Sequence, residues 1–236
     1  MARENPLLSI VTVVYNGREA ITPTLESIRR HKTAAVEYVV VDGGSTDGTL
    51  DLLEQHKDII DTLISEPDKG IYDAMNKAWK LATGVFILNI NIGDELLRLP
   101  ETELREAKNL NLDALSFPVI LSNNSTFYPV AGAKLRINNT LHHQGTLYRR
   151  TLPERYNLQY RVFADFDLNQ RLYKQGKIIK VYPKAISKHD TGGISHSRKY
   201  FNEVYDIIGS NFGSMYKFFA FLNFKLLGLK GWIRRK

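Results

Sequence analysis

The sequence predicts an α/β protein built on a doubly wound mixed sheet, with a helical section at its C-terminal end. Through the first hundred residues, apolar β-branched runs alternate with amphipathic segments. This alternation is typical of a mostly parallel sheet with helices on both faces. Near Pro100 the alternation stops, and shorter strand-like runs with irregular connections predict a mixed or antiparallel continuation. From Tyr200 to Trp232 the residues favour helix.

The first half of the chain divides into regular elements. Apolar residues spaced by three and four predict an amphipathic helix over residues 71–82, which Gly84 ends. A second helix, Thr46–Gln55, is expected to open with a Ser45/Thr46 cap. The other expected elements are strands at Leu7–Val14, Val36–Val41, Ile60–Ser65 and Val85–Ile90, and a helix at Glu19–Arg30.

The second half is less regular. One helix is expected at Ala164–Lys174, where apolar residues recur every four positions. We expect one domain over residues 1–212, with halves of about residues 1–98 and 99–212, followed by a basic amphipathic tail at residues 213–236. The expected strands are Asn111–Ile120, Thr126–Val130, Gly145–Arg149, Ile178–Tyr182 and Ala185–Lys188.

Composition excludes several classes of protein. Hydrophobic residues make up 43% of the 236 residues and charged residues 24%, which is ordinary for a soluble globular protein. The chain contains no cysteine, so disulfides and thiolate metal sites are excluded. No segment reaches the roughly 18 consecutive apolar residues that a membrane-spanning helix needs. We interpret Leu7–Val14 as a strand rather than a signal peptide, because it is β-branched and no cleavage site follows it.

The positive charge is concentrated in the tail. Net charge is +7, and no carboxylate follows Asp206. Aromatic and basic residues without acidic ones predict an interfacial helix on an anionic membrane leaflet. A core-packing helix pair with a basic end is the alternative, and no nucleic-acid motif supports a nucleic-acid partner. The six cations beyond Asp206 are Lys217, Lys225, Lys230, Arg234, Arg235 and Lys236.

Polar and glycine residues follow three of the predicted strands, at the sheet edge where open α/β sheets bind ligands. Asp42 is followed by two glycines, and it suits a nucleoside because a carboxylate accepts from a base N–H or a ribose hydroxyl. The alternative is a turn whose polar residues cap the next helix, which is our interpretation of Asp47. The strand at Val85–Ile90 leads to Asp94, and the helix over residues 71–82 follows Lys69.

Four ordered stretches, at residues 12–16, 40–49, 66–77 and 88–96, together resemble the family 2 glycosyltransferases with the GT-A (nucleotide-diphospho-sugar transferase) fold. Residues 164–168 resemble the segment of that family that holds the catalytic base, and residues 142–144 and 192–195 also have counterparts there. The run Asp-Lys-Gly-Ile-Tyr-Asp-Ala-Met-Asn at residues 68–76 is typical of bacterial enzymes that build colanic acid, capsule or O-antigen units. The resemblance covers about residues 7–195.

The resemblance implies roles for individual residues. Asp165 would be the catalytic base, and Asp94 would end the metal-binding motif. His189 is a candidate further metal ligand, and His143 and Asp167 are candidates for contact with the acceptor. The implied donor-binding residues are Val13, Tyr15, Asn16, Asp42, Lys69, Gly70, Asp73, Asn76 and Asn91, of which Val13, Tyr15 and Asp42 would hold uracil and ribose.

The metal motif departs from the family pattern. The family usually has Asp-x-Asp, whereas this chain has Asn91-Ile92-Gly93-Asp94. One carboxylate can still hold Mg²⁺ or Mn²⁺, because such sites keep several waters and take ligands from substrate phosphates. We therefore expect a divalent metal cofactor with weak affinity in the absence of nucleotide.

The chemistry of sugar transfer agrees with these roles. The acceptor hydroxyl must lose its proton as it attacks, so a carboxylate base is required. Asp165 lies at the start of its helix, where the dipole favours the ionised form. The alternative is that Asp165 and Asp167 only cap that helix.

The sequence thus predicts an inverting hexosyltransferase. It would move sugar from a nucleotide donor, UDP-linked, to a lipid-linked saccharide in bacterial surface polysaccharide synthesis. The enzyme would be cytoplasmic and peripheral at the inner face of the cytoplasmic membrane, bound through its tail. Two alternatives stay open at this point: a sugar-nucleotide nucleotidyltransferase and a catalytically degenerate binding subunit.

Overall fold

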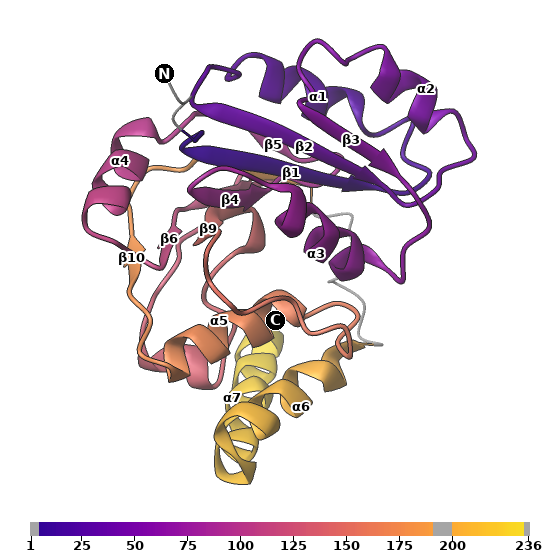
Figure 1. Ribbon diagram of the computed structural model, residues 1–236. Coiled ribbons are helices and arrows are strands. Elements are labelled where there is room, and N and C mark those ends of the chain that lie inside the picture. Colours follow the sequence, from indigo (N-terminus) through magenta and orange to yellow (C-terminus); the bar gives the residue numbers. More distant parts are fainter. Residues whose placement is uncertain (1–4, 191–199, 234–236) are drawn as a thin grey trace.

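The structure is a computed structural model that describes residues 5–190 and 200–233, with side chains up to residue 226 in the last helix. A seven-stranded sheet with the order β10-β6-β9-β4-β1-β2-β3 crosses the molecule (Figure 1). Its strands are β1 (Leu8–Val14), β2 (Val36–Asp42), β3 (Thr62–Ser65), β4 (Phe86–Asn89), β6 (Ala114–Ser116), β9 (Thr146–Arg149) and β10 (Ile179–Val181). A smaller sheet with the order β5-β11-β7-β8 contains β5 (Glu95–Leu96), β7 (Val119–Leu121), β8 (Thr126–Phe127) and β11 (Ser187–His189).

Strand direction changes where the predicted alternation stops. β1 is parallel to both β2 and β4, and β3 is parallel to β2. β9 then runs antiparallel to both β4 and β6. The doubly wound mixed sheet is therefore confirmed, and the carboxyl ends of β1, β2 and β4 share one edge.

Helices cover both faces of the large sheet (Figure 1). On one face α1 (Thr22–Arg29), α2 (Thr49–Glu54) and α4 (Glu101–Asn109) contribute Leu25, Leu53 and Leu104 to one buried apolar cluster. On the other face α3 (Ile71–Leu81), α5 (Ala164–Lys174) and α6 (Phe201–Phe212) contribute Trp79, Leu168 and Ile207 to a second cluster. Sandwiching the sheet in this way explains why its central strands are apolar throughout.

Two sequence predictions about local structure were wrong, and one helix was missing from them. The helix expected from Thr46 begins only at Thr49, because Gly48 takes a left-handed conformation (φ 87°), and neither Ser45 nor Thr46 caps it. The expected strand Asn111–Ile120 is divided between β6 and β7 in different sheets, since Pro118 lies between them and lacks an N–H for the ladder. Helix α4 was not expected at all.

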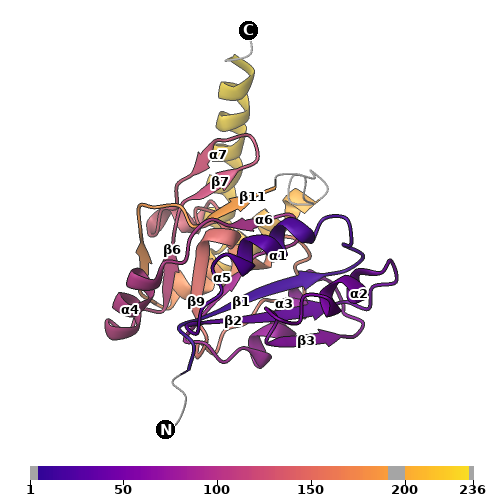
Figure 2. The ribbon, with the colours of Figure 1, turned by 90° about the horizontal axis from the view of Figure 1, so that it is seen from above.

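The C-terminal section is a pair of helices, α6 and α7 (Ser214–Ile233), which pack against each other. Ala220 of α7 is fully buried, and the ring of Phe224 contacts those of Phe201 and Tyr205 on α6. Seen from above, α7 projects beyond the rest of the molecule (Figure 2). Within the described residues, no helix combines the length and the hydropathy that crossing a bilayer requires.

Candidate active site

The loops after β1 and β2 are joined by side-chain to backbone hydrogen bonds. Asn16 takes a positive φ of 48°, and its Oδ1 accepts the N–H of Thr46 at 2.9 Å. The N–H of Asn16 donates to Ser45 Oγ at 2.8 Å, and that of Gly17 donates to Thr49 Oγ1 at 2.9 Å. Asn16 and Ser45 therefore shape this edge of the sheet rather than projecting freely from it.

Asp42 is buried at the end of β2. Its Oδ2 accepts the N–H of Gly44 at 3.1 Å, the N–H of Ser45 at 3.0 Å and the hydroxyl of Ser65 at 2.6 Å. The carboxylate thus fixes the turn in which the two glycines lie. Val13 is buried in the core, whereas Tyr15 is 62% exposed at the same edge.

The segment before α3 lies against the loop after β2. A Cβ on Gly43 would meet the carboxylate of Asp68, so any other residue here would require the Asp68 side chain to move. Oδ1 of Asp68 accepts the N–H of Gly70 at 2.7 Å, and Oδ2 of Asp73 accepts the N–H of Lys69 at 3.0 Å. Lys69 and Gly70, which precede α3, therefore lie together with Asp73 of its first turn.

Asn76 connects α3 to the second half of the chain. Its Nδ2 donates to the carbonyl of Tyr156 at 2.9 Å, and its Oδ1 accepts the N–H of the same residue at 3.1 Å. Both ends of the amide are thereby engaged with one peptide backbone. In the structure Asn76 positions the loop before α5.

Asp94 lies in the loop between β4 and β5, where it is buried, and only one of its two carboxylate oxygens has a hydrogen-bond partner. Its Oδ1 lies 2.8 Å from Nδ1 of His189 and accepts the N–H of Asp190 at 3.0 Å. Its Oδ2 and the Oδ1 of Asn91 are both buried without a hydrogen-bond partner. A buried oxygen without a hydrogen-bond partner costs free energy. Two such oxygens in one turn therefore favour the binding of a cation between them.

These oxygens fit a hard divalent cation. Carboxylate and amide oxygens suit Mg²⁺ or Mn²⁺, with phosphates and water completing the coordination. The described residues contain no cluster of three or more histidines and carboxylates that could hold a metal unaided. Asp94 and Asn91 therefore fit a metal that arrives with its nucleotide.

Asp165 lies in the first turn of α5 and is largely buried. Its Oδ1 is 3.0 Å from the hydroxyl of Tyr72 on α3, and its Oδ2 is 3.4 Å from Nδ2 of Asn139. Burial raises the pKa of Tyr72, and the charge of Asp165 raises it further, so the phenol stays protonated. The Asp165 carboxylate thus lies between two neutral hydrogen-bond donors.

His143 lies near both carboxylates, in the short 3₁₀ helix η2 (His143–Gly145). Burial lowers the pKa of His143, and the nearby charges of Asp165 and Asp94 oppose that effect. Both of its ring nitrogens are buried without a hydrogen-bond partner. The rings of Tyr72 and Tyr156 pack edge-on to His143, with centroids at 6.5 and 5.8 Å. His143 thus lies close enough to Asp165 and Asp94 for both charges to act on its pKa.

Asp167 has a partner on each oxygen. Nε of Arg171 lies 2.8 Å from its Oδ2, and Nδ2 of Asn211 donates to its Oδ1 at 3.1 Å. Those partners lie on α5 and α6, so in this structure Asp167 ties the two helices together.

Three residues at the site were absent from the sequence-based set: Tyr72, Asn139 and Glu203. Tyr72 lies three positions before Met75 on the buried stripe of α3, where a buried phenol needs a partner. No motif or spacing in the sequence around Asn139 or Glu203 indicates that either residue lies near the site. The stretch at residues 192–195 lies outside the described residues.

The mixed sheet, with its polar residues at the carboxyl ends of the parallel strands, defines a GT-A glycosyltransferase. The family model "Glycosyl transferase family 2" matches residues 9–96. A "PGL/p-HBAD biosynthesis glycosyltransferase" of Mycobacterium bovis is 33% identical over 210 residues, covering 81% of this chain and 80% of the relative. The chain therefore belongs to glycosyltransferase family 2 and is a transferase enzyme.

Other relatives agree with this membership. The putative teichuronic acid biosynthesis glycosyltransferase TuaG of Bacillus subtilis is 34% identical over 98 residues, covering 40% of this chain and 39% of TuaG. S. aureus TarS 1-349 in complex with UDP-GlcNAc has a TM-score of 0.72 at 19% identity, covering 86% of this chain and 66% of that chain. The mannosyltransferase PcManGT of Pyrobaculum calidifontis, in complex with GDP-Man and Mn²⁺, has a TM-score of 0.60 at 18% identity, covering 88% and 62%. The chain thus spans about two thirds of these solved chains.

Proposed function

We propose that the enzyme transfers a hexose, with inversion, from a UDP-sugar to a hydroxyl of a lipid-linked saccharide. The observation that supports this most directly is the burial of two carboxylates, Asp94 and Asp165, one in each half of the chain. Asp94 ends the metal motif and Asp165 begins α5, and both charges act on the same imidazole. One carboxylate at the leaving group and one at the nucleophile is what an inverting displacement needs.

Asp165 accepts the proton of the acceptor hydroxyl as that oxygen attacks the anomeric carbon. The carbon–oxygen bond to the donor phosphate breaks on the opposite side, so an α-linked donor gives a β-linked product. His143 is neutral at pH 7, because burial lowers its pKa, so its ring carries one donor and one acceptor nitrogen.

Donor binding is assigned to the edge formed by β1, β2 and the first turn of α3. The ring of Tyr15, which is exposed, would stack on uracil, and the backbone around Gly43 and Gly44 would approach the ribose. Lys69 and Asp73 lie in the turn that would face the sugar. Asp94 and Asn91 would hold Mg²⁺ or Mn²⁺, which neutralises charge on the leaving diphosphate when bound.

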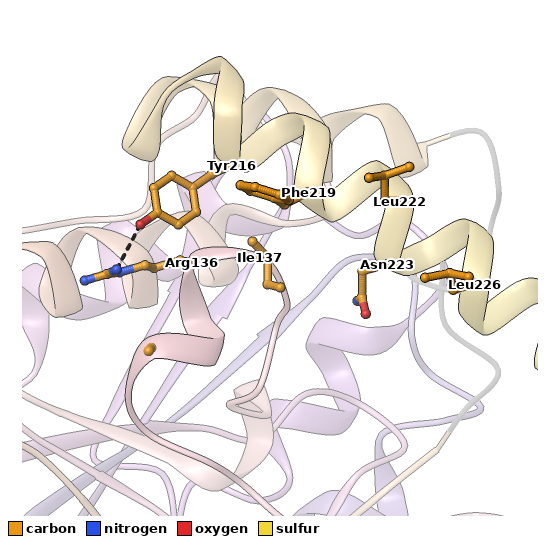
Figure 3. A pocket seen from close by; sticks show the side chains of 8 residues that line it. Arg136, Ile137, Tyr216, Phe219, Leu222, Asn223 and Leu226 are labelled. Atoms are coloured by element: carbon orange, nitrogen blue, oxygen red, sulfur yellow. Dashed lines mark hydrogen bonds between the residues drawn. The ribbon is translucent and has the colours of Figure 1, made fainter.

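We assign α7 to the membrane surface. Phe218 is 58% exposed and Leu226 59%, and a groove of about 450 Å³ separates α7 from the 3₁₀ helix η1 (Ala133–Arg136). Figure 3 shows Arg136 donating to the Tyr216 hydroxyl, at 2.9 Å, at one end of this apolar groove. Exposed aromatics on a helix that carries cations but no carboxylate suit the headgroup region of an anionic leaflet. This supports a peripheral location at the cytoplasmic membrane.

The names of relatives support a role in building surface glycans. The relatives above are named for PGL/p-HBAD and teichuronic acid biosynthesis. An acceptor on a bacterial lipid carrier, of the kind used for capsule or O-antigen units, agrees with the placement of α7.

Release of UDP tests the proposal. We expect the purified enzyme, with Mn²⁺ and one member of a UDP-sugar panel, to release UDP faster when a lipid-linked saccharide extract is added. Release of pyrophosphate instead of UDP would indicate a nucleotidyltransferase. No release with any donor would indicate a binding subunit.

A further inference from the structure

The turn that precedes α5 is held by a carboxylate from α6. Oε1 of Glu203 accepts the N–H of Arg161 at 3.0 Å, and Oε2 accepts those of Val162 and Phe163 at 3.0 and 3.2 Å. α5 has no side-chain cap at Phe163. Because hydrogen bonds to a charged acceptor are about twice as strong as neutral ones, Glu203 fixes the turn that leads to Asp165.

The peptide between Val162 and Phe163 is hydrogen-bonded at both ends. Its N–H donates to Glu203, and its carbonyl accepts the hydroxyl of Tyr72 at 2.7 Å. A hydrogen bond at one end of an amide strengthens the one at the other end. The Glu203 carboxylate therefore makes the Val162 carbonyl a better acceptor for Tyr72.

The Tyr72 hydroxyl has one proton and two acceptors within reach. The Val162 carbonyl is 2.7 Å away and Oδ1 of Asp165 is 3.0 Å away. Since the phenol stays protonated, its proton is given to one acceptor at a time. When the proton points to Val162, Asp165 keeps its lone pairs for the acceptor hydroxyl.

We propose that Glu203 is a positioning residue for the base. Through the Val162–Phe163 peptide it directs the Tyr72 proton away from Asp165, in addition to holding the turn. This inference rests on the proposed function of Asp165. It differs from a purely structural role in one respect: the effect of Glu203 on the rate depends on the Tyr72 hydroxyl.

A double-mutant cycle measures that dependence. We expect Glu203→Gln, which keeps the shape and removes the charge, to lower kcat for transfer about tenfold while donor KM changes less than about twofold. In a Tyr72→Phe background, the same Glu203→Gln change should lower kcat less than about twofold, because contacting residues couple. Rates are expressed per UDP-binding site, so a misfolded fraction does not contribute.

The control is Asp206→Asn, on the same helix, which neutralises an exposed carboxylate paired with Lys217. It should leave kcat unchanged. An equal fall with and without the Tyr72 hydroxyl, or no fall in either background, would overturn the inference alone. A wild-type enzyme that transfers no sugar would overturn the proposed function and this inference with it.

Discussion

The hydroxyl of Tyr72 lies 3.0 Å from Oδ1 of Asp165, although 93 residues separate the two in the sequence. Tyr72 belongs to the helix that follows the donor loops, and Asp165 begins the helix of the second half. The contact brings the proposed base against the element that carries the proposed sugar-binding turn. Donor and acceptor would therefore meet at this pair.

We predict that Asp165→Asn abolishes transfer while UDP binding is retained. The amide keeps the shape and the contact with Tyr72 but cannot accept the proton, so kcat should fall by about 10²–10⁴. Asp51→Asn, which changes an exposed aspartate in the first turn of α2, is the matched control and should keep full activity. Steady-state rates with titration of UDP binding provide the measurement. Near-normal turnover by Asp165→Asn would show that another residue is the base.

We predict that Asp94→Asn uncouples nucleotide binding from metal. In the wild type, Mn²⁺ should tighten UDP binding, because the unpartnered Oδ2 of Asp94 gains a ligand. Calorimetric titration of UDP with and without Mn²⁺ should show no metal effect in Asp94→Asn, and transfer should be lost. Glu95→Gln is the control, since the Glu95 carboxylate pairs with Arg30 and Lys188 instead. Full wild-type activity in excess chelator would defeat the metal assignment.

We predict that His143 makes the metal-free protein less stable in acid. Its pKa is lowered in the folded state, chiefly by burial, so the unfolded state binds more protons below about pH 6.5. The contribution of neutral His143 to the free energy of unfolding is then fully present above that pH, and it is lost as the pH falls toward the folded-state pKa. Denaturant titrations in EDTA at pH 7 and pH 5 should show a smaller loss for His143→Asn than for the wild type. An equal loss in both proteins would contradict the prediction.

We predict that the exposed apolar side chains of α7 hold the enzyme on anionic vesicles. Phe218→Ser and Leu222→Ser should each weaken binding about tenfold, because each removes roughly 1.5–3 kcal/mol of apolar burial at most. Tyr128→Ser, at a side chain that is 69% exposed near β8, is the control. Sedimentation with vesicles at low salt provides the measurement. If the wild-type protein does not bind such vesicles, α7 has a structural role and does not bind the membrane.

The sequence predicted those parts of the fold that depend on local patterns. Helix α5 has the predicted bounds, Ala164–Lys174, because its apolar residues recur at helical spacing. Helix α4 was missed, since only Leu104 and Ala107 mark its buried side. Glutamates at positions 101 and 103 and a lysine at position 108 are the end signals that could have revealed it.

Contacts between residues that are far apart in the sequence could not be predicted from the sequence. The amide of Asn76 pairs with the backbone of Tyr156, 80 residues away, and Glu203 holds the turn before α5 from 40 residues away. No periodicity or spacing encodes such pairs, because they depend on how α3, α5 and α6 pack. The roles of the individual donor-binding residues stay predictions for the same reason.

The anomeric configuration of the product tests the central claim most directly. Proton NMR of the disaccharide formed from an α-linked UDP-sugar reports the configuration at the new bond. If Asp165 activates the acceptor for direct displacement, the product is β-linked in the wild type and no product forms with Asp165→Asn. An α-linked product, or a β-linked product formed at wild-type rate by Asp165→Asn, would contradict the account.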